Sequence, residues 1–287
     1  MPGVAVVTDS TSYLPRDLVA ARGIHEVSLY VSEGARQRRE LDIADYARFY
    51  ADLRAASDLP TTSQPSIGDF AAVYEPLLAA GADVVSVHIS GGISGTIESA
   101  RQAAAEVAGR YPGRRIEVVD STVSAGALGL VVLAAARNAE TGGDVDAVVG
   151  AANAAVAAMQ FWFAVDTLEY LRRGGRIGAA QAWLGGALKI KPILTLDGQI
   201  TPIERVRTSR RAFERMVELL RSRHADGADA WVVQHVQSPE VADRLVEQGR
   251  AIFGSEPAFV SEVGPVIGAH VGPGLVGVGG IPRALTG

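Results

Sequence analysis

The chain has 287 residues, of which 48% are hydrophobic and 21% charged, a composition typical of a globular protein with room for two hydrophobic cores. Its formal net charge of −5 argues against nucleic acid as a main partner, because phosphate binding needs a basic surface. The sequence contains no cysteine, which excludes disulfides, thiolate nucleophiles and cysteine-bound metals.

The longest apolar stretch, residues 123–136, is too short to span a bilayer. The first basic residue is Arg16, so no basic segment of a signal peptide is visible near the start. We therefore expect a cytoplasmic protein without a transmembrane segment.

In the first half of the chain, short apolar runs alternate with helical patterns. Strands are predicted at residues 4–7, 27–31, 84–89 and 116–119, and helices from about Pro15 and at 43–55, 67–80, 96–108 and 125–139. This alternation is typical of a mostly parallel sheet with helices on both faces.

The second half has a different pattern. A helix at 144–159, with Asp144 as its N-cap, precedes a strand at 161–165. Asp197 and Gly198 lie between two β-rich runs and predict a hairpin with a type I′ turn. Further elements are predicted as a helix at 212–223, a strand at 230–236, a helix at 241–253 after Pro239, and a strand at 258–263.

We therefore predict an α/β fold with two domains. Residues 1–159 form an N-terminal domain around a mostly parallel sheet with helices on both faces. Residues 160–287 form a C-terminal mixed α/β domain, because a hairpin among helices indicates a mixed, hairpin-containing sheet.

Four polar clusters lie in loops of the first half, at residues 8–12, 61–66, 90–96 and 120–124. Parallel sheets bind ligands beyond the carboxyl ends of their strands, so we expect at least three clusters to share one edge. In the third cluster, Gly91, Gly92 and Gly95 would let the backbone approach a ligand closely. Ser94 and Thr96 then begin a helix, whose free amides favour an anion. The alternative is a simple helix cap with a flexible lead-in.

Several enzyme motifs fail on inspection. The nucleophile elbow G-x-S-x-G is broken by Thr96, and the G-K-[S/T] of a P-loop is absent. The G-x-G-x-x-G at 272–277 lies too near the C-terminus for a βαβ unit. The five histidines lack metal-ligand spacing. We interpret His88 as a satisfied core residue, whereas His270, among glycines, either supports its loop or contacts a ligand.

Taken together, the motifs resemble those of DegV-family proteins, in the same order and over nearly the whole chain. They are VVTDST at 6–11, TSQPS at 62–66, ISGT at 93–96, VVDS at 118–121, YLRRGGRI at 170–177, LKIKP at 188–192 and HVGPG at 270–274.

The resemblance implies a fatty-acid-binding protein of two domains, the binding subunit of a bacterial fatty acid kinase that serves phospholipid metabolism. The carrier is not itself catalytic and needs no cofactor; an ATP-dependent kinase subunit makes the acyl phosphate. By this similarity Thr62 and Ser94 bind the carboxylate and His270 lies close to it. Residues expected to support the site or face the partner are Ser63, Gly95, Thr96, Arg172, Arg173, Arg176 and Arg207.

The physical chemistry of a fatty acid suits this hypothesis. A dozen buried methylenes contribute roughly 10 kcal/mol before the costs of association. The carboxylate needs hydrogen bonds, because an unpaired buried charge is expensive. Candidate tail-contacting segments are apolar and rich in alanine or glycine, at residues 123–136, 145–159 and 179–188. The alternative function is an acyl-transfer or hydrolytic enzyme that uses Ser94 with His88 or His270.

Overall fold

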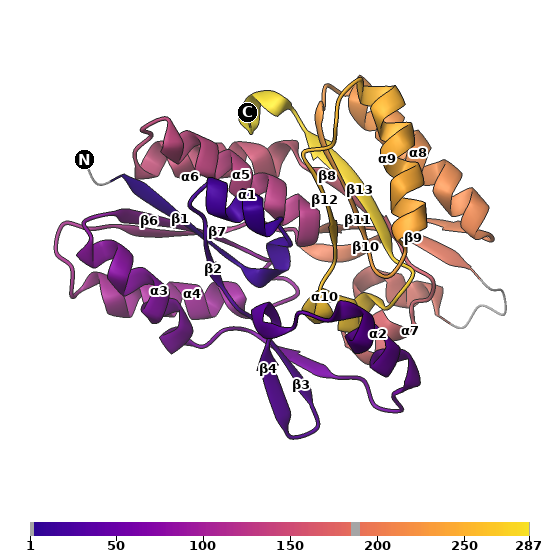
Figure 1. Ribbon diagram of the computed structural model, residues 1–287, viewed down its shortest axis with the longest axis horizontal. Helices are drawn as coiled ribbons and strands as arrows, with labels where there is room; N and C mark the ends of the chain where they lie inside the picture. Colours follow the sequence, from indigo (N-terminus) through magenta and orange to yellow (C-terminus); the bar gives the residue numbers. More distant parts are fainter. Residues whose placement is uncertain (1–2, 185–189, 287) are drawn as a thin grey trace.

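The computed structural model describes residues 3–184 and 190–286 and confirms the mixed α/β fold (Figure 1). Two large sheets lie beside each other, and a smaller three-stranded sheet projects from the region between them (Figure 1). Within the described residues, no helix has both the length and the apolar character needed to cross a bilayer.

The first sheet is parallel throughout, with strand order β2-β1-β6-β7. Its strands are β1 (Val4–Asp9), β2 (His25–Val27), β6 (Asp83–His88) and β7 (Ile116–Asp120). Alternate side chains point to opposite faces, so Val7 packs under α3 (Ile67–Ala79) and α4 (Thr96–Ala108). Val6 packs on the other side with α5 (Ala125–Glu140) and α6 (Val145–Ala158). The prediction of a parallel sheet covered on both faces is confirmed.

The second sheet has the strand order β10-β9-β8-β13-β11-β12 and mixes parallel and antiparallel pairs. Its strands are β8 (Gln160–Ala164), β9 (Lys191–Asp197), β10 (Gln199–Val206), β11 (Ala230–His235), β12 (Phe259–Glu262) and β13 (Val276–Ile281). Helices α8 (Ser209–Ala225) and α9 (Pro239–Phe253) cover one face (Figure 1). The other face turns toward α5 and the first sheet.

The predicted hairpin exists as β9 and β10, but its turn is not of type I′. That turn needs positive φ at both central residues, and of Asp197 and Gly198 only the glycine has it, at +70°. Strand β13, in the middle of the sheet, was not predicted at all. Its glycines hide the β pattern, yet a side chain at Gly279 would collide with the backbone of β8.

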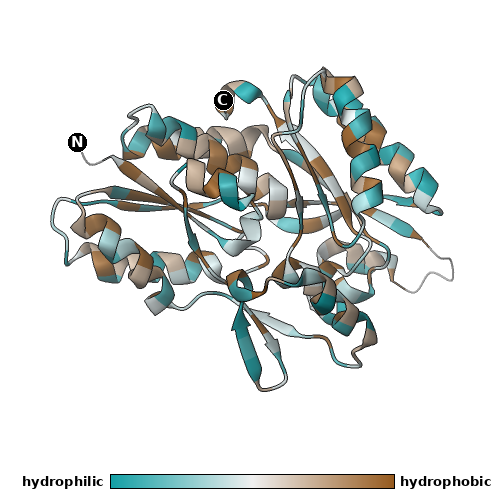
Figure 2. Cartoon of the chain, viewed as in Figure 1, coloured by the Kyte–Doolittle hydropathy of each residue, from teal (hydrophilic) through white to brown (hydrophobic). Residues whose placement is uncertain are grey.

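The third sheet, order β4-β3-β5, also corrects the sequence prediction. Its strands are β3 (Tyr30–Glu33), β4 (Arg36–Arg39) and β5 (Thr61–Ser63). The single strand predicted at 27–31 is wrong, because the run divides into β2 and β3, which belong to different sheets. β4 is hydrophilic along its length (Figure 2), so it carries no apolar alternation that could have revealed it.

The remaining helices are short. In the described residues they are α1 (Arg16–Ala21), α2 (Tyr46–Ala55), α7 (Glu169–Arg173), α10 (Pro265–Val271) and four 3-10 turns at Ser10–Ser12, Glu40–Asp42, Gly178–Trp183 and Arg283–Leu285. Asp144 caps α6 as predicted, since its side chain accepts a hydrogen bond from the Ala147 amide.

Every strand of the second sheet follows residue 159, while the largest core joins side chains of both halves. The boundary at 159/160 stays a prediction.

Candidate functional site

A narrow cavity of about 80 Å³ lies where the carboxyl edge of the first sheet meets the inner face of the second. Its walls are mainly apolar, and they include Leu29, Ile89, Ile93, Phe161, Phe163, Leu171, Leu196, Ile200, Val263, Val266, Ile267, Val271 and Leu275. Polar side chains join them, among them Thr62, Ser63, Gln64, Ser94, Ser124, Arg176, Gln234 and His270. A cavity of this composition suits a ligand with a long apolar part and one polar group.

The three residues predicted to bind the carboxylate all line this cavity, although they come from distant parts of the chain. Thr62 lies on β5, Ser94 follows β6, and His270 lies in the last turn of α10. Thr62 Oγ1 is 2.7 Å from His270 Nε2, so the two side chains share a hydrogen bond. Their common location is what the sequence hypothesis requires, and their role in binding stays a prediction.

Strand pairing holds Thr62 in place. Thr62 pairs with Val31 of β3 in an antiparallel register, so its position is set by a strand and not by a helix-capping loop. Further along the same polar cluster, Ser66 caps α3 in a reciprocal capping box with Asp69. One polar cluster therefore divides between cavity-lining and structural residues.

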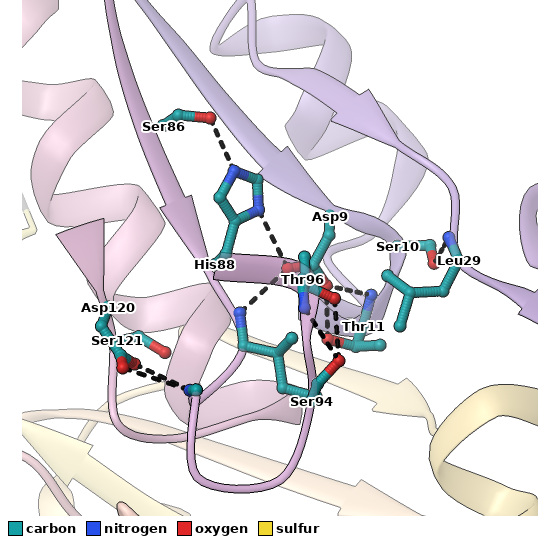
Figure 3. A network of polar contacts seen from close by, with 12 residues as sticks. Asp9, Ser10, Thr11, Leu29, Ser86, His88, Ser94, Thr96, Asp120 and Ser121 are labelled. Carbon is teal, nitrogen blue, oxygen red and sulfur yellow. Dashed lines mark hydrogen bonds and ion pairs between the residues drawn. The ribbon is translucent and has the colours of Figure 1, made fainter. Parts of the chain in front are cut away.

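The loop before α4 holds Ser94. Its hydroxyl oxygen lies 2.8 Å from Thr96 Oγ1 and accepts a 3.3 Å hydrogen bond from the Thr96 amide (Figure 3). Gly95 lines the cavity as the N-cap residue of α4. Thr96 is fully buried, so it supports Ser94 from behind the cavity wall.

The paired glycines of this loop lie close to other parts of the chain. The Gly91 amide donates to both carboxylate oxygens of Asp120 (Figure 3). A side chain at Gly92 would collide with the carbonyl of Gly198, at the tip of the β9–β10 hairpin. Gly92 therefore lets the hairpin of the second sheet pack against the loop, and the expectation that Gly91 and Gly92 make room for a ligand stays a prediction. The polar clusters at residues 8–12, 90–96 and 120–124 lie at the carboxyl ends of β1, β6 and β7. These strands are parallel, so the three clusters share one edge of the first sheet, as predicted.

His270 is uncharged at neutral pH. Burial, and to a smaller extent repulsion from the nearby Arg176 guanidinium, lower its pKa to about 4. While Nε2 contacts Thr62, the buried Nδ1 has no hydrogen-bond partner in the part of the chain described. Nδ1 packs against Gly174, where any side chain would collide with the ring.

The four arginines that we expect to support the site or face the partner have different surroundings. Arg176 lines the cavity and donates to the Ile93 and Gly174 carbonyls. Arg172 instead forms an exposed ion pair with Glu169, 2.6 Å long. Arg173 donates to the Ser57 carbonyl at 2.5 Å, and Arg207 is an exposed residue outside the cavity lining. Only Arg176, of these four, comes to the cavity.

The predicted tail-contacting helices contribute little to the cavity. From 123–136 it is lined by Ser124 and Ala125, and from 145–159 by no residue, because α6 packs on α5 and the first sheet. Residues 179–184 do not line it, and 185–188 lie outside the described residues. The apolar wall comes instead from loops, from α7 and α10, and from strands, for example Phe161 and Phe163 of β8. Phe161 and Phe163 are two positions apart in the sequence, so in a strand both side chains project from the same face of the sheet. This spacing was the signal that could have identified them as wall residues.

The core prediction for His88 is confirmed. Its ring lies between Ser86 Oγ, 2.6 Å from Nε2, and Asp9 Oδ2, 3.0 Å from Nδ1 (Figure 3). This pattern resembles a serine–histidine–aspartate triad. However, all three side chains are fully buried, and Ser86 also accepts a hydrogen bond from Tyr74. The network therefore ties β1 to β6 and offers no accessible nucleophile.

Among the described residues, no group of three histidine or carboxylate side chains is arranged to hold a metal.

The fold is that of a mixed α/β protein with a largely apolar cavity, and comparison with known proteins identifies its family. Residues 3–283 match the family described as uncharacterised proteins of the DegV family. The chain is 43% identical over 281 residues to a DegV domain-containing protein of Streptomyces coelicolor, covering 96% of this chain and 97% of the relative. It is 36% identical over 280 residues to protein DegV of Bacillus subtilis, with 96% and 98% covered. The chain belongs to the DegV family.

Two solved structures extend this finding. A DegV family protein from Thermus thermophilus, described by its fatty acid binding, has a TM-score of 0.87 at 35% identity and covers 98% of this chain and 99% of its own. DegV from Bacillus subtilis, described as a fatty acid binding protein, has a TM-score of 0.86 at 36% identity, with 97% and 99% covered.

Proposed function

We propose that this protein is a non-catalytic carrier that buries one long-chain fatty acid and presents its carboxylate to an ATP-dependent fatty acid kinase subunit. One observation carries the proposal: a single cavity joins Thr62, Ser94 and His270 to a mainly apolar wall. The fatty acid binding described for the two similar DegV proteins supports the same ligand class.

The chemistry of the polar end suits a carboxylate. With its proton on Nε2, neutral His270 donates to Thr62, which leaves the Thr62 hydroxyl proton for a ligand oxygen. The Ser94 hydroxyl supplies a second donor at the entrance of α4, where the helix dipole favours negative charge. Arg176 supplies positive charge at the same end of the cavity. These groups meet a carboxylate's need for hydrogen bonds without a permanently buried cation.

A partner can reach this end of the cavity. An open depression of about 440 Å³ shares Ser94, Gly95 and Arg176 with the cavity and is otherwise lined partly by glycines. The kinase subunit would approach here, transfer a phosphoryl group from ATP to the carboxylate, and leave the acyl chain buried. The exposed Arg172, Arg173 and Arg207 are candidates to face that subunit. The role needs ATP and therefore a cytoplasmic setting.

The enzyme alternative has less support from the geometry. The hydrogen bond of Ser94 goes to Thr96, and that of His270 goes to Thr62. His88 is bound to Ser86 and Asp9. No histidine contact in the described residues therefore activates Ser94 as a nucleophile. Turnover of an activated acyl ester by the isolated protein would favour the enzyme.

Binding can be tested by titrating delipidated protein with a fluorescent long-chain fatty acid. Replacing Thr62 by valine or Ser94 by alanine removes one charge-assisted hydrogen bond, which contributes about 1.5–3 kcal/mol. Each change should weaken binding by roughly 10- to 150-fold. Thr201→Val is the matched control, because Thr201 is an exposed strand residue outside the cavity lining. Wild-type affinity in the double variant would contradict the assignment.

The kinase role needs its own experiment. The loaded carrier, a fatty acid kinase subunit and radiolabelled ATP should together give an acyl phosphate, and omission of the carrier should abolish it. Thr62→Val and Ser94→Ala should lower the yield at equal fatty acid loading. If the carrier binds fatty acid but never supports phosphorylation, the proposal of fatty acid binding stands and the proposal of a kinase partner is wrong.

A further inference from the structure

A buried carboxylate, Glu40, lies directly behind the cavity wall. Its side chain is 1% exposed, and three groups donate hydrogen bonds to it. Oε1 accepts from the Val266 amide at 2.7 Å and from the Tyr13 hydroxyl at 2.9 Å, while Oε2 accepts from Ser10 Oγ at 2.5 Å. Glu40 is not among the residues that line the cavity, so it acts on a ligand only through its neighbours.

The first neighbour is α10, which contributes Val266, Ile267 and His270 to the cavity. The first amides of a helix have no partner within the helix itself. In α10, Glu40 satisfies the Val266 amide, and the Tyr13 hydroxyl accepts from the Ile267 amide at 3.2 Å. Both acceptors come from residues more than 200 positions earlier in the chain, so they fix α10 to the N-terminal half.

The second neighbour is Leu29, on another wall of the cavity. The Glu40 amide donates to the Leu29 carbonyl at 2.8 Å. The Leu29 amide donates to Ser10 Oγ at 3.1 Å, and Ser10 in turn binds the Glu40 carboxylate (Figure 3 shows Ser10 beside Leu29). Glu40 therefore ties together two wall segments that have no sequence proximity.

The packing around this junction leaves α10 little freedom. A side chain at Gly264 would lie 2.8 Å from Glu40 Oε1, and one at Gly268 would overlap the Tyr50 hydroxyl. The Tyr50 hydroxyl also donates to the Val263 carbonyl at 2.6 Å. These close contacts allow α10 only one position against the N-terminal half. The hydrogen bonds that Glu40 and Tyr13 accept hold the first turn of α10 in that position.

We propose that Glu40, together with Tyr13, is a positioning residue for the ligand site: it holds α10 so that His270 meets Thr62 and the cavity keeps its width at Leu29. The proposal rests on the proposed function for its ligand. The acceptor atom Oε1 performs this role, not the negative charge. A glutamine at position 40 keeps that acceptor, and its amide group can donate to Ser10 Oγ.

The test compares Glu40→Leu, Glu40→Gln and Tyr13→Phe in the full-length chain. We expect Glu40→Leu and Tyr13→Phe to weaken binding of the fluorescent fatty acid by about tenfold, and Glu40→Gln by less than about threefold. Tyr74→Phe is the matched control, because Tyr74 is a buried tyrosine whose hydroxyl binds Ser86. It should leave affinity unchanged.

A second measurement reads the position of His270 without any ligand. The ring-nitrogen NMR shifts of His270 should change in Glu40→Leu and Tyr13→Phe, and stay constant in Glu40→Gln and Tyr74→Phe. If Glu40→Leu does not fold, Tyr13→Phe still decides. Wild-type affinity and unchanged His270 shifts in a folded Tyr13→Phe protein would overturn the proposal. A wild-type protein that binds no fatty acid would instead refute the proposed function, while the NMR shifts would still test the positioning.

Discussion

Glu40 should make the protein less stable as the pH rises through the weakly acidic range. Burial raises the pKa of its carboxyl from 4.5 to about 7, an increase that the hydrogen bonds from Ser10, Val266 and Tyr13 partly oppose and the Asp9 carboxylate reinforces. Because the folded state then binds the proton more tightly than the unfolded state, stability is highest below pH 4.5 as far as this group is concerned. The stabilising contribution disappears as the pH rises to about 7.

The size of the effect follows from the two pKa values. Since one pKa unit corresponds to 1.36 kcal/mol, the difference between 4.5 and about 7 costs about 3 kcal/mol of folding free energy by pH 7.5. The surrounding ionisable groups, Asp9, Tyr13, Tyr46 and Tyr50, supply no positive charge to offset the penalty. Glu40→Gln removes the titration and retains the acceptor for α10.

Urea unfolding of wild type and Glu40→Gln should be measured from pH 4.5 to 8. The difference in unfolding free energy between the two proteins should change by about 3 kcal/mol across that range, in favour of the variant at high pH. Because both proteins contain the same other ionisable groups, the contributions of those groups to the pH dependence of stability cancel in the difference. A difference that stays constant with pH would show that Glu40 titrates at its ordinary pKa, and would refute the reasoning from burial.

Two further predictions concern the cavity. His270 should have the opposite pH dependence, because burial lowers its pKa from 6.5 to about 4, so its stabilising contribution grows as the pH rises through that window. His270→Gln should therefore lose about 3 kcal/mol of this pH-dependent gain in urea titrations extended below pH 4, and an unchanged dependence of stability on pH would contradict the lowered pKa of His270. Leu196→Trp should fill the apolar part of the cavity, which Leu196 lines, and abolish uptake of the fluorescent fatty acid although Thr62 and Ser94 remain. Unaltered binding, in a variant shown to be folded by its unfolding curve, would place the acyl chain elsewhere.

Local signals predicted most of the fold. The alternation of strands and helices predicted the parallel first sheet, and Asp144 marked the start of α6 because a capping side chain acts within four residues. The elements that were missed have weak local signals. β13 is rich in glycine because neighbouring strands crowd it, and β4 is polar on an exposed edge. Only the assembled sheet shows why they are strands.

The site could be predicted to a smaller degree. The resemblance pointed to Thr62, Ser94 and His270, and the structure places all three on one cavity. The wall was not predicted, because it depends on how two sheets face each other and not on any one segment. Glu40 had no signal in the sequence, where it follows two arginines and resembles a surface residue. Its burial arises from contacts with Val266, 226 positions away.

Native mass spectrometry of the purified, untreated protein would show whether the cavity holds a fatty acid. We expect a complex heavier than the polypeptide by the mass of one long-chain fatty acid, and loss of that mass in the Thr62→Val, Ser94→Ala double variant. If the wild-type protein shows only the bare polypeptide mass and takes up no fatty acid when one is supplied, the proposed fatty acid binding is wrong.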